Sequence, residues 1–467
     1  MHHRRRTATA TAAAALLLLP GCAGGPGPGD AVVLRVYDGD GQQLSWRQFR
    51  DVESNGTGSD GYNDALLDPE TLQVTEIGPL YRDSEGVALD SPGGSAVLAL
   101  AWPSSDGYSQ LLLPVPPPGT YNFNLLAARQ AVSGLRELMA AHPDEAPAAD
   151  AAAASATATA ELANAEHAKG ESAAAVAATR AYDAAVHAQV LLLQQYGAGR
   201  ASTLRRGVTL DEIPDEATLS RARSAVGDGG WIRLVLDPDT PLTAYAAPLA
   251  AAHRLGLRVL ALPVDSSAMA GLSDKAWRSR IAAAVAALPD VDQWEAGNEV
   301  NGDWLGKDVA ARVAWAADHV HQHTRASVLV TLYWQLGEGD RQHSLFNWLA
   351  AHPEAVARAD DVGLSLYPEE HPLGAATDTV LTRLRAVLPG HTLMISELGY
   401  SSADLEHIWW WGSPTDPAGA GRAAVASLYT LAPAGYPFTG GGPFWWYFAQ
   451  DGAAGTPLDG ALRAAWR

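Results

Sequence analysis

The chain has 467 residues, which is longer than one ordinary domain and leaves room for a barrel of about 250 residues plus smaller units. Charged residues make up 18% of it, and the formal net charge is −20 at pH 7. An acidic surface repels phosphates, so nucleic acid is excluded as the expected partner.

The first 22 residues have the order of an export signal, with a basic start at 4–6 and an apolar stretch at 12–19 that is too short to span a bilayer as a mature helix. The ending, Leu19-Pro20-Gly21-Cys22, resembles the lipobox of bacterial lipoproteins, although proline is unusual there. This resemblance implies that Cys22 carries lipid and anchors the exported protein on the extracytoplasmic side of the membrane. A plain secretory signal is the alternative, and the export route stays open. Cys22 is the only cysteine, so it has no partner for an internal disulfide.

Residues 23–30 are rich in glycine and proline, which is typical of a tether. Between 31 and 120, short alternating runs separated by turn residues predict an antiparallel, sandwich-like β domain. Residues 56–61, Gly-Thr-Gly-Ser-Asp-Gly, match the letters of a dinucleotide fingerprint, but no strand precedes them and no helix follows, so we interpret them as a turn. Residues 38–41, Asp-Gly-Asp-Gly, lack the other ligands of a calcium loop and predict a hairpin turn.

An alanine-rich helical segment is predicted over 121–200. Two apolar stripes with helical spacing flank a loose Ala/Pro stretch at 142–159, which predicts a helical hairpin that ends at Gly197 and Gly199. A linker or a contact with another protein are the alternatives. The stripe residues are Ala128, Val132, Leu135 and Met139, then Tyr182, Val186, Val190 and Leu193.

From 201 to 467 an apolar run, a polar loop and a helical segment alternate eight times, as in a (β/α)8 TIM barrel of parallel strands. Helices are expected at 245–255, 274–288, 308–324 and 376–388. The predicted strands are 206–210, 231–237, 257–265, 291–299, 327–334, 361–367, 391–397 and 444–448.

Polar and aromatic side chains gather at the ends of these strands, where barrel enzymes place their active sites. They are Asp237, Asp265, Asn298, Glu299, Trp334, Tyr367, Glu397 and Trp446. Two of them, Glu299 and Glu397, end the fourth and seventh runs. Cleavage of a glycosidic bond with retention needs two facing carboxyl groups, about 5 to 5.5 Å apart, of which one donates a proton and the other attacks the anomeric carbon.

At these positions the chain resembles the retaining glycoside hydrolases of clan A, over residues 205–467. The resemblance implies that Glu299, after Asn298, is the acid/base and that Glu397 is the nucleophile. It also implies that Trp446 floors the sugar site, and that Arg233 holds the nucleophile ionised. Tyr367 resembles an aromatic residue commonly found after the sixth strand of these enzymes. Residues 231–238 and 362–368 look somewhat like endo-β-1,4-galactanases, although the third strand lacks the histidine usual there.

The chemistry sets further expectations for this site. A nearby charged nucleophile should raise the pKa of Glu299, and Asn298 should hold the sugar 2-hydroxyl. Flat sugar faces stack on aromatic rings, so we expect Trp334, Trp446 and one tryptophan of the loop at 409–411 to contact substrate. No cofactor and no metal site are expected, because His319, His321 and His323 lie on an outer helix and lack the glutamate of a zinc-protease motif.

We therefore expect a retaining glycoside hydrolase acting on β-glycosidic bonds of an extracellular or cell-envelope polysaccharide. A non-catalytic carbohydrate-binding lipoprotein that uses the barrel as a lectin-like platform is the alternative. A third hypothesis makes the β domain the functional part and the barrel auxiliary. The sequence indicates neither the sugar nor the oligomeric state.

Overall fold

The computed structural model describes residues 31–53, 64–336, 340–400, 417–451 and 454–466. The export signal with Cys22, the tether, the glycine-rich 56–61 and the tryptophans at 409–411 lie outside the described residues, so the predictions about them stay predictions. Among the described helices, none is both long and apolar enough to cross a membrane.

The N-terminal β domain contains two four-stranded sheets, with strand orders β4-β5-β1-β8 and β3-β2-β6-β7. All pairs are antiparallel except β1 with β8, which are parallel. The predicted turn at 38–41 is confirmed, because Tyr37 pairs with Gln43 across it. The strands are β1 (Ala31–Arg35), β2 (Ala65–Leu67), β3 (Val74–Ile77), β4 (Tyr81–Arg82), β5 (Val87–Asp90), β6 (Val97–Ser104), β7 (Gly107–Pro114) and β8 (Gly119–Asn122), and one helix, α1 (Trp46–Glu53), lies among them.

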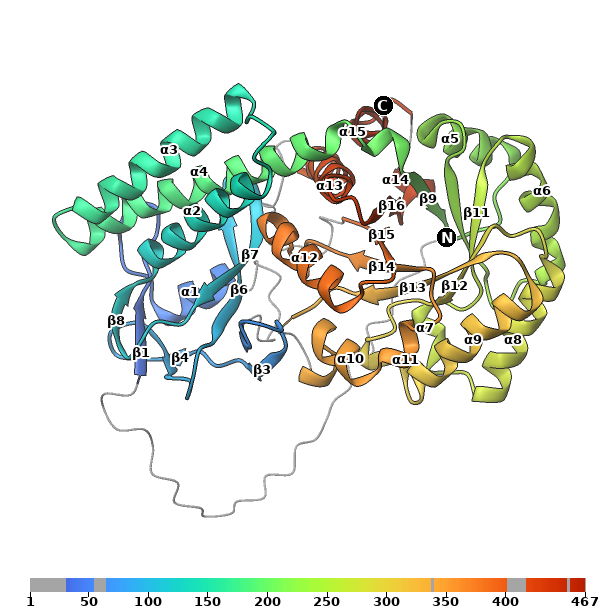
Figure 1. Cartoon of the computed structure of the whole chain (residues 1–467), viewed down its shortest axis with the longest axis horizontal. Helices are drawn as coiled ribbons and strands as arrows, with labels where there is room; N and C mark the ends of the chain where they lie inside the picture. Colours follow the sequence, from blue (N-terminus) through green and yellow to red (C-terminus); the bar gives the residue numbers. More distant parts are fainter. Residues whose placement is uncertain (1–30, 54–63, 337–339, 401–416, 452–453, 467) are drawn as a thin grey trace, which may run out of the picture.

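Three helices follow, α2 (Phe123–Ala141), α3 (Ala149–His167) and α4 (Glu171–Ala198), and in Figure 1 they form a layer above the β domain. The predicted hairpin of two helices was wrong, because α3 begins inside the stretch that was expected to be loose. Its buried residues are Ala151, Ala158, Leu162 and Ala165. Small alanine side chains pack closely and give no stripe of large apolar residues, so the helical period was hidden.

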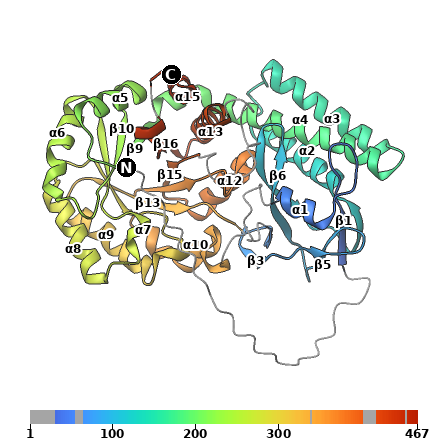
Figure 2. The ribbon, with the colours of Figure 1, turned by 180° about the vertical axis from the view of Figure 1, so that it is seen from behind.

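The C-terminal part is a closed barrel of eight parallel strands, in the order β10-β11-β12-β13-β14-β15-β16-β9, which confirms the predicted (β/α)8 TIM barrel. Figures 1 and 2 show the helices around it. The strands are β9 (Arg205–Leu210), β10 (Trp231–Val235), β11 (Arg258–Leu262), β12 (Gln293–Gly297), β13 (Ser327–Tyr333), β14 (Asp361–Leu366), β15 (Thr392–Leu398) and β16 (Thr439–Trp445).

The predicted barrel helices are found within a residue or two of their expected bounds. The α-helices are α5 (Glu216–Val226), α6 (Ala246–Arg254), α7 (Ser266–Met269), α8 (Asp274–Ala287), α9 (Val309–His323), α10 (Leu345–Ala351), α11 (Pro353–Val356), α12 (Thr377–Val387), α13 (Pro417–Ala434), α14 (Phe448–Asp451) and α15 (Pro457–Ala465). Short 3₁₀ turns are η1 (Ala201–Thr203), η2 (Leu242–Tyr245), η3 (Asp303–Leu305), η4 (Arg341–His343) and η5 (Gly374–Ala376).

The barrel strands are buried on both faces, which is why they appear in the sequence as continuous apolar runs. Inside the barrel one apolar cluster fills the space between the strands, so the barrel is a packed core rather than a pore. This cluster is formed by Trp231, Leu260, Leu329, Met394 and Phe444.

The predicted bounds of the last barrel strand, 444–448, were wrong. It begins at Thr439 rather than at 444, and Phe448 already belongs to α14. The run Gly440-Gly441-Gly442-Pro443 has the composition of a loop. Glycine is needed here because neighbouring strands come very close: a Cβ on Gly441 would lie 2.3 Å from the Arg205 carbonyl oxygen.

The helical layer and the barrel meet where α4 crosses α13. A Cβ on Gly197 would lie 1.7 Å from the carbonyl oxygen of Leu431, so only glycine allows this contact.

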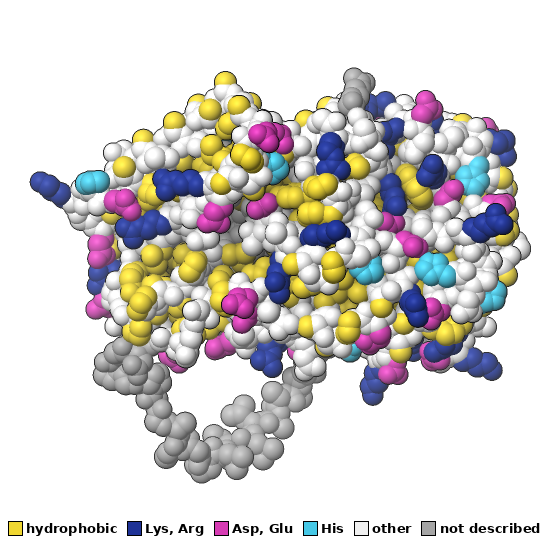
Figure 3. Space-filling view, in the orientation of Figure 1, with side chains coloured by type: hydrophobic (Ala, Val, Ile, Leu, Met, Phe, Trp, Pro, Cys, Tyr) yellow, Lys and Arg dark blue, Asp and Glu magenta, His cyan; other side chains and the backbone are white. Residues whose placement is uncertain are grey.

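In the view of Figure 3, hydrophobic side chains gather over the β domain and beside α12, whereas charged side chains are spread over the barrel helices.

The three histidines of α9 do not gather into one group. His319 and His323 stack on one another with ring centroids 4.1 Å apart, while His321 pairs with Asp360 on the surface. Within the described part of the chain, no group of three or more side chains could hold a metal ion.

Candidate active site

Two strands carry the predicted catalytic carboxylates to the same end of the barrel. Glu397 lies near the end of β15, and Glu299 follows two residues after the end of β12. Both strands carry a bulge just before the glutamate, with Ala296 and Ser396 as the extra residues. Bulges beside active sites re-aim side chains. The carboxyl ends of parallel strands meet at one rim, so both glutamates reach a common cavity.

That cavity has a volume of about 540 Å³. It is lined by Asp265, Ser266, Ser267, Glu299, Trp304, Tyr333, Tyr367, Glu370, Glu397 and Trp446. Aromatic rings and carboxylates dominate this lining, and none of these described residues is a lysine or an arginine. The mixture suits a neutral ligand with flat apolar faces and hydroxyl groups.

Glu397 is held by three donors of different kinds. The guanidinium of Arg233 forms an ion pair with Glu397, with Nη1 2.9 Å from Oε2. The amide Nδ2 of Asn298 donates to the same oxygen over 3.1 Å. The phenol of Tyr367 donates to the other oxygen, Oε1, over 2.5 Å. A positive charge and hydrogen bonds to both oxygens stabilise the ionised form of this carboxyl group.

Arg233 itself is fully buried, and a second carboxylate shares it. Its Nε and Nη2 donate to the two oxygens of Glu295 over 2.6 and 2.9 Å, in a bidentate pair. The hydroxyl of Thr331 donates to Glu295 as well, over 2.7 Å. The ring of Trp446 covers the guanidinium at 5.0 Å. Arg233 is therefore fixed on three sides and presents one remaining nitrogen to Glu397.

Glu299 has neutral partners. The hydroxyl of Ser266 lies 2.7 Å from its Oε2, and the hydroxyl of Ser365 lies 2.8 Å from its Oε1. No ion pair with a cation is found for it among the described residues. Its backbone has φ of 53°, a left-handed conformation that is rare for residues other than glycine. Such strained backbone is often found at functional sites, where the surrounding structure holds it.

The surroundings of the two carboxyl groups affect their protonation differently. Burial, followed by the charge of Glu397, raises the pKa of Glu299 to about 8, against the weaker opposite effect of its two serine partners. Near neutral pH this carboxyl group is therefore protonated and able to donate. The expectation of a raised pKa agrees with this, but burial rather than the neighbouring charge is its first cause.

Glu397 is buried as well, and burial raises its pKa too. The charge of Arg233 and the hydrogen bond from Tyr367 act in the opposite direction. Burial also lowers the pKa of Arg233, but the carboxylates of Glu295 and Glu397 more than reverse this effect. Because Glu397 has a cation beside it and Glu299 has none, Glu397 is the one that loses its proton first.

Most of the predicted site residues lie together, and one does not. Tyr367 and Trp446 line the cavity, while Asn298 and Arg233 lie just behind it and contact Glu397. Trp334 is only 1% exposed and is absent from the lining. Its neighbour Tyr333 lines the cavity instead, because successive strand residues point in opposite directions.

Sequence reasoning missed several side chains. Glu295 was not singled out, although a glutamate in the middle of a doubly buried strand needs a partner and was a usable signal. Ser266, Ser365 and Trp304 gave no signal, because single serines and tryptophans are common in sequences of this kind. The two serines act through contacts with Glu299, which is far from both in the sequence.

No family model matches the chain, and no curated protein matches it. A solved fungal β-1,4-galactanase is 16% identical with a TM-score of 0.39, and the match covers 56% of this chain and 99% of that one. An intracellular xylanase from Thermoanaerobacterium saccharolyticum is 12% identical with a TM-score of 0.40, and the match covers 57% of this chain and 97% of that one. A 3-dehydroquinate dehydratase from Aquifex aeolicus is 13% identical with a TM-score of 0.34, and the match covers 56% of this chain and 99% of that one. Such distant likenesses do not determine a reaction, so function must be inferred from the side chains in the cavity.

The raised pKa of Glu299 predicts a pH-dependent stability. The folded state favours the protonated carboxyl group, so this stabilising contribution is complete below the ordinary pKa of 4.5 and is lost as the pH rises to about 8. Glu299→Gln, which stays neutral, should therefore gain melting temperature relative to wild type between pH 5 and 8, and the gain should level off above that. Calorimetry across this range measures it, with the exposed Glu354→Gln as control. A Glu299→Gln difference that does not vary with pH would contradict the assignment.

Proposed function

We propose that the barrel is a retaining glycoside hydrolase of the clan A type, which cleaves β-glycosidic bonds of a polysaccharide. One observation carries the proposal: one buried glutamate is paired with a guanidinium, and the other, on the same cavity, is held by neutral hydroxyls. An ionised nucleophile and a protonated acid are the two forms that this reaction needs at the start.

In the proposed first step, the Glu397 carboxylate attacks the anomeric carbon while Glu299 gives its proton to the leaving glycosidic oxygen. The bond to the leaving group breaks, and the sugar is left as an ester on Glu397. In the second step, Glu299, now ionised, takes a proton from water, whose oxygen attacks the same carbon and releases Glu397. Two inversions retain the configuration.

The remaining residues would position the sugar. Trp446 lines the cavity and would offer its ring to the sugar. The same ring also contacts the guanidinium of Arg233. The amide of Asn298 lies beside Glu397, where the 2-hydroxyl of a bound sugar would come. Trp304, 40% exposed at the cavity, offers a further ring. The lining suits an oligosaccharide or polysaccharide substrate. The proposed reaction uses no cofactor.

Substitution of each glutamate tests the two roles. Glu397→Ala should abolish hydrolysis and leave oligosaccharide binding largely intact. Glu299→Ala should slow hydrolysis by about 10²- to 10⁴-fold, and less for substrates whose leaving group needs no protonation. Azide should rescue Glu299→Ala and give a β-glycosyl azide, identified by NMR. The exposed Glu354→Ala is the matched control.

Two results would count against this assignment. Azide rescue of Glu397→Ala with a product of retained configuration, and of Glu299→Ala with an inverted product, would exchange the two roles. A wild-type protein that binds glycans but hydrolyses none in a broad polysaccharide screen would support the lectin-like alternative.

We also propose that Cys22 anchors the exported protein to the membrane by lipid, on the extracytoplasmic side. The lipobox-like ending at Cys22, the only cysteine of the chain, supports this. Cys22→Ser should move the protein from the membrane fraction to the soluble fraction or leave the signal unprocessed. Unchanged partitioning into detergent would contradict the anchor.

A further inference from the structure

The loop after β14 carries two residues of the cavity. Tyr367, at its start, donates to Glu397, and Glu370 accepts a hydrogen bond of 3.0 Å from the hydroxyl of Tyr333. We call residues 367–376 the strand-six loop, because β14 is the sixth strand of the barrel in chain order, counted from β9. The place of this loop therefore determines both a donor to the proposed nucleophile and a contact across the cavity.

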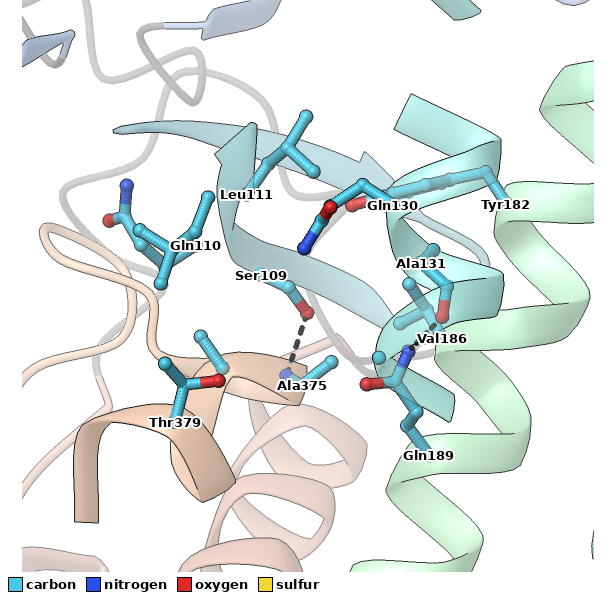
Figure 4. Close-up of a pocket in the computed structure, with 13 residues that line it drawn as sticks. Ser109, Gln110, Leu111, Gln130, Ala131, Tyr182, Val186, Gln189, Ala375 and Thr379 are labelled. Atoms are coloured by element: carbon cyan, nitrogen blue, oxygen red, sulfur yellow. Dashed lines mark hydrogen bonds between the residues drawn. The ribbon is translucent and has the colours of Figure 1, made fainter. Parts of the chain in front are cut away.

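The far end of the strand-six loop is held by the β domain. The backbone N–H of Ala375 donates to Ser109 Oγ over 3.0 Å, and the N–H of Gln110 donates to the carbonyl oxygen of Leu373 over 3.3 Å. Figure 4 shows this junction, where β7 faces the turn that carries Ala375. Ser109 is 2% exposed, so its hydroxyl has little access to water.

Gly374 makes this junction tight. A Cβ at this position would lie 2.2 Å from Ser109 Oγ and 2.8 Å from its Cβ, and the backbone has φ of 52°. Its N–H donates to the Tyr429 hydroxyl over 2.8 Å, from the side of α13. Glycine is therefore required both for the conformation and for the close approach of β7. The loop is held between the β domain and the barrel helices.

A second junction involves β3, at the opposite edge of the sheet that contains β7. Asn347 on α10 pairs with the backbone of Val74 in β3, accepting from its N–H over 2.7 Å and donating to its carbonyl over 2.9 Å. The guanidinium of Arg341 donates to the carbonyl oxygen of Thr75 over 3.1 Å. The β domain thus contacts the segments that follow both β13 and β14, and the Tyr333–Glu370 hydrogen bond joins these segments at the cavity.

We propose that the β domain is part of the catalytic unit: Ser109 and Gly374 are positioning residues that hold the strand-six loop where Tyr367 reaches Glu397. This role differs from that of a separate sugar-binding module, which would bind glycan on its own surface and would not position the strand-six loop. The kinetic part of the test below rests on the proposed function, whereas the hydrogen-exchange part does not.

Gly374→Ala tests the junction, because the added methyl group pushes against Ser109. Gly256→Ala is the matched control, since Gly256 also has positive φ (74°) but has open space around its Cβ position. Amide hydrogen exchange of residues 367–376 should become at least about tenfold faster in Gly374→Ala and stay unchanged in Gly256→Ala. Ser109→Ala, which removes the hydroxyl that accepts from the Ala375 N–H, should speed exchange of the same residues as well.

The kinetic readout follows the same variants. A misplaced Tyr367 should lower kcat by between about 10- and 100-fold in Gly374→Ala and by a smaller factor in Ser109→Ala, and kcat should stay unchanged in Gly256→Ala. Unchanged exchange of the strand-six loop in Gly374→Ala would overturn the positioning role, whether or not the wild type hydrolyses a glycan. Faster exchange with unchanged kcat would overturn it too, because the loop would then move without effect on the reaction. A wild type without activity would refute the proposed function and leave the exchange result to decide the junction.

Discussion

The site is organised around one buried positive charge. Arg233 has no access to water, and a buried guanidinium is costly unless carboxylates pair with it. Glu295 supplies a bidentate partner, and Glu397 supplies a second partner on the remaining nitrogen. Glu299 is buried without a paired cation, and burial, followed by the charge of Glu397, raises its pKa so that it keeps its proton. The two glutamates of the cavity thus differ because Arg233 lies beside only one of them.

The barrel explains how residues far apart in the chain reach this arrangement. Arg233 comes from β10, Glu295 from β12 and Glu397 from β15, and all three point inward near one rim. The bulges before Glu299 and Glu397 shift each glutamate out of the simple strand alternation. The β domain contributes from outside, through contacts at Ser109 and Asn347 with the segments beside the cavity.

Sequence reasoning recovered the parts that depend on local patterns. Parallel strands buried on both faces give continuous apolar runs, and a carboxylate at the end of such a run is visible. This was enough to bring Glu299, Glu397 and Asn298 to one rim, whereas Arg233 was predicted from the resemblance to the retaining glycoside hydrolases of clan A. It failed at β16, where three glycines allow strands to approach closely but resemble a loop. It also failed at Trp334, where inward and outward positions differ by a single residue.

Contacts between distant segments were beyond the sequence. Nothing in the sequence around Glu299, Ser266 or Ser365 indicates that these side chains will meet. The same holds for Ser109 and Ala375, which are 266 positions apart. Such pairs depend on barrel closure and on the packing of the β domain, and both are properties of the whole fold.

We infer that Glu299 is protonated and Glu397 is ionised in the resting protein. Neutron diffraction from deuterated crystals near pH 6.5 observes this directly. We expect a deuteron on a carboxyl oxygen of Glu299, none on Glu397, and one on the Tyr367 hydroxyl directed at Glu397. A deuteron on Glu397 with a bare Glu299 would contradict it.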